Sequence, residues 1–205
     1  NNHVQAFLVK SVDRIINMNW EDILPPPRGA GRTHYLTAIT RVDDKLVEVI
    51  DVEKVLQEIS PFNTQVAPDV LDADIRSLSE GLEVLVIDDS TVGLAQVRET
   101  LDQMGMNIVA LRDGAQALRY LKKLAGDGVD MHKRLPLVIT DAEMPEMDGY
   151  RLTTEIRNDP RLAPLYVVLH TSLSGSFNNA MVKKVGCDEF LSKFEPDKLA
   201  ASVQA

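Results

Sequence analysis

From residue 82 onward, short apolar runs of strand length alternate with segments that have helical periodicity, and few folds allow this pattern. The runs are Val84–Ile87, Asn107–Leu111, Leu135–Thr140, Tyr166–Leu169 and Glu189–Leu191. Strands that are apolar on both faces and separated by helices are typical of a parallel sheet covered on each side. The sequence therefore predicts an α/β domain with five strands in this part of the chain.

The segments between these runs repeat apolar residues at helical spacing. Leu94, Val97, Leu101 and Met104 are separated by three or four positions, which predicts one face of a helix that ends near Gly105. The same spacing occurs in two further groups: Ala117, Leu121 and Leu124, then Phe177, Met181 and Val185 before Gly186. Each group predicts a helix that packs its apolar side against the sheet.

The residues before position 60 follow a different pattern. The ranges 35–42 and 45–52 flank Asp43-Asp44, which predicts a hairpin with a tight acidic turn. The range 53–59 predicts a short amphipathic helix, and the three prolines at 25–27 predict a loop. This part of the chain is therefore expected to be small and mainly β.

A segment rich in prolines and in small or acidic residues separates the two patterns. It extends from Ser60 to Gly81 and shows only a weak helical repeat. We place a linker at 62–81, between a first domain at 1–61 and a second at 82–205. A short helix in the linker is expected to pack between the two parts.

Composition excludes several classes of protein. The net charge is −9, and no segment clusters the basic residues that a nonspecific grip on nucleic acid requires. No apolar run approaches the roughly 20 residues of a membrane span. The single cysteine, Cys187, indicates no internal disulfide, and the four histidines are too scattered for a zinc site. We expect a cytoplasmic protein, and the first residue, Asn1, suggests a piece of a longer one.

Reactive side chains follow four of the five predicted strands. Asp88 and Asp89 follow the first, Asp141 follows the third, Thr171 the fourth and Lys193 the fifth. Because the carboxyl ends of parallel strands meet at one edge of the sheet, these side chains are expected to lie close together. Each motif alone would be ordinary, since an Asp pair is usually a turn or a helix cap. Their joint placement favours a functional site.

Three carboxylates held together either take up protons or bind a cation. Mg²⁺ fits such a site because it prefers hard oxygen ligands and keeps several waters. We predict Asp89 and Asp141 as direct ligands and Asp88 as a ligand through water. The backbone carbonyl of Glu143 is a further predicted ligand.

The predicted chemistry is phosphoryl transfer to Asp141. A bound cation would reduce the repulsion at the site, so that the Asp141 carboxylate can attack phosphorus. Lys193 would then balance charge on the equatorial oxygens, and Thr171 would donate its hydroxyl to one of them.

At these residues the chain resembles a response-regulator receiver domain, over about 120 residues. The matching motifs are the Asp88-Asp89 pair, Asp141 before Met144-Pro145 and Asp148-Gly149, Thr171 with Ser172, and Lys193. The resemblance implies a five-stranded, parallel, doubly wound, flavodoxin-like fold. It also implies phosphoryl transfer from a histidine kinase to Asp141, with Thr171 and Phe190 as switch residues.

The sequence departs from the receiver pattern in three places. Phe194 follows Lys193 where the family usually has proline, so a cis peptide bond there would cost about 3 kcal/mol. Glu143 adds a carboxylate beside the acceptor. The range 126–134 lengthens one connection and is expected to be a surface loop.

The first domain resembles the C-terminal half of a CheW-like coupling domain. The matching stretches are 7–16, 20–27, 35–39 and 43–52. The resemblance implies a β structure that bridges the cytoplasmic tips of chemoreceptors and a histidine kinase of the CheA type. Residues before Asn1 are expected to complete it, because the fragment alone would expose unpaired strand edges.

A coupling domain followed by a receiver resembles the architecture of the CheV family. The resemblance implies an adaptor at receptor arrays that binds neither DNA nor the membrane interior and whose phosphorylation adjusts coupling between receptor and kinase. It is not expected to be an enzyme beyond its own phosphorylation and dephosphorylation. With only ten residues after Glu195, the output is expected from the coupling domain or the receiver surface.

Two alternatives remain open. The receiver could be a phosphate sink that drains the kinase without controlling the adaptor. An aspartyl-phosphate phosphatase resembling the haloacid dehalogenase family fits less well, because that family has Asp-x-Asp after its first strand and this chain has adjacent Asp88-Asp89. A dinucleotide-binding domain is weaker still, because no Gly-x-Gly-x-x-Gly follows Ile87.

Overall fold

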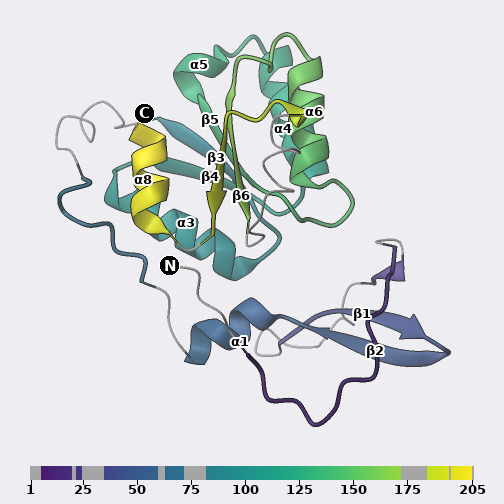
Figure 1. Cartoon of the computed structure of the whole chain (residues 1–205). Helices are drawn as coiled ribbons and strands as arrows, with labels where there is room; N and C mark the ends of the chain where they lie inside the picture. Colours follow the sequence, from purple (N-terminus) through teal and green to yellow (C-terminus); the bar gives the residue numbers. More distant parts are fainter. Residues whose placement is uncertain are drawn as a thin grey trace. The chain divides into compact units, whose positions relative to one another are not determined.

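The computed structural model describes residues 6–19, 22–24, 35–59, 63–71, 82–171, 184–193 and 195–204. The chain divides into two compact units, Asn1–Asp51 and Val52–Ala205, and each is described by itself (Figure 1). Among the described residues, no helix has the length and apolar character that crossing a membrane would require.

The second unit contains a sheet of five parallel strands, in the spatial order β4-β3-β5-β6-β7. The strands are β3 (Glu83–Ile87), β4 (Asn107–Leu111), β5 (Leu137–Asp141), β6 (Tyr166–Thr171) and β7 (Glu189–Ser192). The chain starts near the middle of the sheet, moves to one edge and then returns to build the other. The predicted flavodoxin-like, doubly wound fold is confirmed.

Helices cover both faces of this sheet (Figure 1). One face carries α3 (Thr91–Gln103) and α8 (Pro196–Gln204), and the other carries α4 (Gly114–Gly126) and α6 (Gly149–Asn158). Each face has its own apolar cluster. Successive residues of β3 point to opposite faces of the sheet, and those from Val84 to Ile87 are all at most 1% exposed. The continuous apolar run predicted this burial on both faces.

Capping side chains begin three of the helices directly after strand ends or loops. Ser90 accepts a hydrogen bond from the Gly93 amide at the start of α3. Asp113 and Asp148 cap α4 and α6 in the same way. Because these caps fix where each helix begins, they also fix the short loops at the carboxyl edge of the sheet.

The range 126–134 differs from the predicted surface loop. It contains the end of α4 and a short helix, α5 (Met131–Arg134). The side chain of Met131 is 5% exposed and joins the apolar cluster on the α4–α6 face. The loop prediction is therefore wrong for Met131, because two apolar residues, Val129 and Met131, in a polar segment give no helical periodicity.

The first unit contains an antiparallel hairpin of β1 (Leu36–Val42) and β2 (Lys45–Ile50). Asp43 and Asp44 both have positive φ angles, 49° and 60°, as a tight hairpin turn requires. Many apolar side chains of this unit are exposed, including Leu8 and Ile15.

The helix α1 (Val52–Ile59), predicted at 53–59, groups with the second unit and lies against α3. The predicted proline loop and most of the helix predicted at 177–185 lie outside the described residues, as does any helix at 72–80 in the linker.

Arg157 of α6 ties the helix to the start of β6 and to the loop before β7. Its guanidinium donates to the carbonyl oxygens of Gly186 (2.6 Å), Ala163 and Leu165 (both 2.8 Å) and to the carboxylate of Asp188 (2.5 Å). Replacing Arg157 with Ala leaves several of these acceptors without a donor. We expect Arg157→Ala to lower the free energy of unfolding by about 2 kcal/mol or more, measured by urea denaturation.

The matched control is Arg119→Ala, which removes an exposed arginine from α4. This variant is expected to change stability by about 0.5 kcal/mol or less. Equal effects of the two substitutions would contradict the structural role assigned to Arg157.

Candidate functional site

The carboxyl edge of the sheet brings together all four groups of predicted site residues. Asp88 directly follows β3, Asp141 ends β5, Thr171 ends β6 and Lys193 directly follows β7. Oxygen atoms of Asp88, Asp89 and Asp141 lie within 4.8 Å of one another. The topology therefore assembles a cluster of three carboxylates from distant parts of the chain.

The ammonium of Lys193 lies between two of these carboxylates. Its Nζ is 2.9 Å from Oδ2 of Asp88 and 2.8 Å from Oδ2 of Asp141. All three side chains are buried, with residue exposures of 2% for Asp88, 6% for Asp141 and 7% for Lys193. One buried cation therefore faces two buried carboxylates, and the neighbouring Asp89 adds a third negative charge.

The pKa of Asp88 is raised to about 7, mainly by burial; Lys193 acts against this rise, and the charge of Asp141 adds to it. The ionised form of the cluster is therefore destabilised near neutral pH. A cation that binds near such a cluster stabilises its ionised form, because the positive charge offsets the repulsion between the carboxylates.

The donor set fits a magnesium ion. It consists of carboxylate oxygens only, and Asp89 is less buried than the other two, so water can reach the cluster. Mg²⁺ prefers a few carboxylate ligands and keeps several waters. Near the cluster, the Glu143 amide donates to Oδ1 of Asp141 at 3.3 Å.

Local hydrogen bonds hold the Asp88 carboxylate in place. The Ser90 amide donates to Oδ1 of Asp88 at 2.9 Å, while the Ser90 hydroxyl caps α3 by accepting from Gly93 at 3.2 Å. The start of α3 and the position of the carboxylate are therefore fixed by the same three-residue turn.

Two glycines leave room for the acidic residues. A Cβ on Gly93 would collide with Oδ2 of Asp88 and would lie 2.7 Å from its Cγ. A Cβ on Gly149 would collide with the backbone oxygen of Asp141. Sequence reasoning singled out Gly149 in its motif but missed Gly93, whose only signal is a glycine in the first turn of an otherwise ordinary helix.

The two predicted switch residues lie on adjacent strands. Thr171 is completely buried, and its carbonyl oxygen accepts a hydrogen bond from the Lys193 amide at 2.9 Å. Phe190, in β7, is partly buried. Ser172, Phe194 and the Lys193–Phe194 peptide bond lie outside the described residues.

His170 is a buried residue that sequence reasoning did not assign to the site. It precedes Thr171 and pairs in register with Asp141 across the sheet. Burial, together with the charge of Lys193, lowers the pKa of His170 to about 3, so its imidazole is neutral at physiological pH. The remaining predicted site residues lie where the strand ends predicted them.

Two protein families match the chain. Residues 84–204 match the response regulator receiver domain, and residues 1–60 match the CheW-like domain. Together these ranges include all of the chain except residues 61–83 and 205.

Three proteins of Helicobacter pylori (strain ATCC 700392 / 26695) are similar over almost all of the chain. Chemotaxis protein CheV3 is 31% identical over 99% of this chain and 66% of its own length. Chemotaxis proteins CheV1 and CheV2 are 29% and 27% identical over 96% and 94% of this chain, in each case 60% of their own length. The chain therefore spans somewhat less than two thirds of these relatives.

Solved structures that are similar to this chain include a chemotaxis protein and a receiver domain. The Vibrio cholerae chemotaxis protein CheY4 is 26% identical with a TM-score of 0.52, covering 60% of this chain and 96% of that protein. The receiver domain of the Arabidopsis thaliana histidine kinase CKI1, solved with Mg²⁺ and BeF₃⁻, is 25% identical with a TM-score of 0.56, covering 64% and 93%.

The family match thus agrees with the parallel sheet and with the acidic cluster at its carboxyl edge. The chain belongs to the response regulator receiver family, and its CheW-like segment followed by a receiver domain is the combination of a CheV-type chemotaxis protein.

Proposed function

We propose that this protein is a chemotaxis adaptor that links chemoreceptors to a CheA-type histidine kinase and is regulated by phosphorylation of Asp141. The observation that carries the phosphorylation proposal is the Lys193 ammonium, which contacts both Asp88 and Asp141 beside the carboxylate of Asp89. The CheW-like match at 1–60 supports the adaptor proposal.

The residues that would hold Mg²⁺ are Asp89 and Asp141 directly, Asp88 through water, and the backbone carbonyl of Glu143. The three carboxylates supply hard oxygen atoms within 4.8 Å of one another. When bound, the ion would neutralise the cluster and stabilise charge on the phosphoryl oxygens.

In the proposed reaction, a carboxylate oxygen of Asp141 forms a bond to phosphorus while the bond from phosphorus to the kinase histidine nitrogen breaks. The nitrogen keeps the bonding electrons, and the product is an acyl phosphate on Asp141. Lys193, already 2.8 Å from Asp141, stays protonated and pairs with a phosphoryl oxygen. The Thr171 hydroxyl donates to another oxygen.

The proposed partners are the kinase and the cytoplasmic tips of chemoreceptors, and the proposed location is the cytoplasm, at receptor arrays. The three Helicobacter relatives are named chemotaxis proteins. A fourth, the sensor histidine kinase CheAY, is 24% identical over 76% of this chain and 19% of its own length. We infer no contact with nucleic acid and no insertion into the membrane.

Gly93→Ala tests the proposed metal site. The added methyl group collides with the Asp88 carboxylate and must displace it from the cluster. We expect Mg²⁺ affinity, measured by isothermal titration calorimetry, to fall by about 10- to 100-fold, as for other changes that reorient a metal ligand.

The control is Gly126→Ala in α4, where a Cβ meets nothing within 4 Å. This variant should bind Mg²⁺ as the parent does. Unchanged affinity in a folded Gly93→Ala protein, verified by circular dichroism, would argue against Asp88 as part of the metal site.

Asp141→Asn tests the acceptor. Incubation of the parent with Mg²⁺ and acetyl phosphate is expected to add one acid-labile phosphoryl group, seen by intact mass spectrometry, whereas Asp141→Asn stays unmodified. Lys193→Met should slow the reaction by about 100-fold, because it removes the charge that stabilises the transition state. The exposed Lys122→Met is the matched control. A parent that takes up no phosphoryl group contradicts the proposal.

Co-sedimentation of full-length protein with receptor-containing membranes and kinase tests regulation of the adaptor. We expect phosphorylation to change the bound fraction by about threefold or more, a typical size for coupling between sites. Asp141→Asn should not respond. Binding that is the same before and after verified phosphorylation would favour the phosphate-sink alternative.

A further inference from the structure

Residues Asn63–Leu71, here called the linker strap, pack against the receiver face formed by α3 and α8. Val66 is 6% exposed and belongs to the apolar cluster on this face, and Val70 and Leu71 pack against the same cluster. This part of the predicted linker is therefore a docked segment.

Gln103 at the end of α3 binds the strap with both ends of its amide. Its Nε2 donates to the carbonyl oxygen of Thr64 at 2.8 Å, and its Oε1 accepts from the Val66 amide at 3.0 Å. The Gln103 side-chain amide thus donates to one backbone carbonyl of the strap and accepts from one backbone amide, as a neighbouring strand would.

Two residues of α8 hold the rest of the strap. The carboxylate of Asp197 accepts from the Ala67 amide at 2.8 Å, and the side chain of Gln204 donates to the carbonyl oxygen of Val70 at 3.0 Å. The strap is therefore fixed to both helices of the face.

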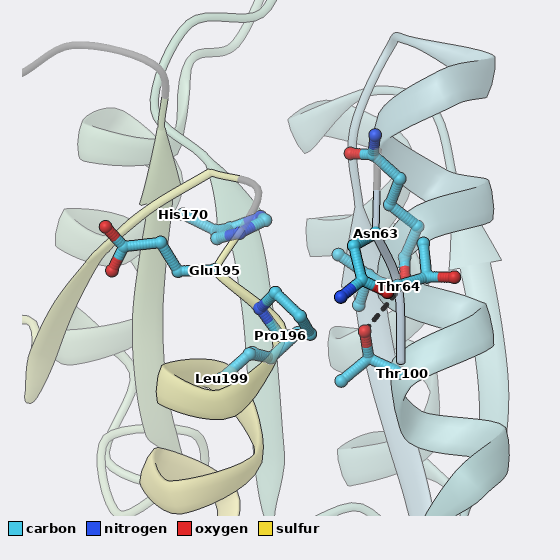
Figure 2. A pocket seen from close by; sticks show the side chains of 9 residues that line it. Asn63, Thr64, Thr100, His170, Glu195, Pro196 and Leu199 are labelled. Carbon is cyan, nitrogen blue, oxygen red and sulfur yellow. Dashed lines mark hydrogen bonds between the residues drawn. The ribbon is translucent and has the colours of Figure 1, made fainter. Parts of the chain in front are cut away.

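The strap and the receiver together line a cavity (Figure 2). Asn63 and Thr64 of the strap lie with Thr100 of α3 on one side, and the opposite side is formed by His170, Glu195, Pro196 and Leu199. The strap thus supplies part of the cavity wall, and the cavity exists in this form only while the strap is docked.

The cavity contains a buried polar side chain without a partner. Gln96 of α3 lines it and is 7% exposed, and neither its Nε2 nor its Oε1 has a hydrogen-bond partner among the described residues. Leaving such a group buried costs free energy, which water entering the cavity would recover. Separation of the strap from the receiver, which would let water reach Gln96, therefore costs less free energy here than it would at a purely apolar interface.

The cavity also adjoins the proposed acceptor site. His170 pairs in register with Asp141 and precedes Thr171, while Glu195 and Pro196 follow Lys193 closely in the chain. A phosphoryl group on Asp141 would attract both Thr171 and Lys193. The chain neighbours of these two residues form the receiver wall of the cavity, so they would move with them.

We propose that the α3–α8 face is a regulatory docking surface whose ligand is the linker strap, and that phosphorylation of Asp141 releases the strap by distorting the cavity beneath it. This inference rests on the proposed phosphorylation. The strap begins three residues after the CheW-like match ends at residue 60. Its release would change how the receiver is connected to that segment.

The coupling is reciprocal, because two equilibria that influence each other do so by the same factor. If phosphorylation weakens docking, then weakening docking must favour the phosphorylated conformation. This consequence can be measured with a noncovalent phosphoryl mimic, independently of phosphorylation rates.

Hydrogen exchange of the whole chain, followed by mass spectrometry or NMR, tests the release. We expect the Ala67 amide, which is held by Asp197, to exchange at least about tenfold faster after treatment with Mg²⁺ and acetyl phosphate. Intact mass verifies the phosphoryl group in the same sample, and Asp141→Asn should show no change in exchange.

Gln103→Ala tests reciprocity, since it removes both contacts of this side chain with the strap. We expect faster exchange at Ala67 without phosphorylation and an affinity for beryllofluoride, with Mg²⁺ present, that is about fivefold tighter than in the parent. Gln116→Ala, on the exposed side of α4, is the control and should change neither quantity.

The outcomes are distinguishable. A chain that carries the phosphoryl group but keeps the parent exchange rate at Ala67 overturns the strap proposal and leaves the proposed function intact. A Gln103→Ala protein with faster exchange but unchanged beryllofluoride affinity also overturns it. Absence of any phosphoryl group would overturn both proposals.

Discussion

The contact of Lys193 with Asp88 and Asp141 is the interaction on which the site depends. Burying three charged groups is costly unless their geometry is good, and here the single ammonium lies less than 3 Å from both carboxylates. That geometry requires the carboxyl ends of β3, β5 and β7 to lie at one edge, as they do in this parallel sheet. The remaining negative charge of the cluster favours the proposed binding of a cation.

The sequence was sufficient to predict the sheet and the placement of Asp88, Asp141, Thr171 and Lys193. Strands that are apolar on both faces specify a covered parallel sheet, and topology alone brings the residues after such strands to one edge. This inference needs no knowledge of side-chain packing. The metal-binding and acceptor roles of these residues remain predictions, because position does not demonstrate chemistry.

Features that depend on tertiary contacts were not predictable. Gly93 matters because the Asp88 carboxylate occupies the space of its missing Cβ, and nothing in the helix sequence shows that approach. Met131 lies in a polar segment in which only Val129 is also apolar, yet it is buried. The strap has one buried apolar residue, Val66, with Val70 and Leu71 partly buried, and its hydrogen bonds to α3 and α8 use backbone groups, which have no sequence signature.

The docked strap changes what the linker can do in the molecule. A flexible linker of about 20 residues would let the two parts of the chain move almost independently, and it would transmit little of a structural change. In the proposed mechanism, a strap that is docked on α3 and α8 exchanges with a released one, and an equilibrium of this kind can be biased from either end. His170 lies both beside Asp141 in the sheet and in the wall of the cavity, so in the proposed mechanism it is one of the residues that connect the acceptor to that equilibrium.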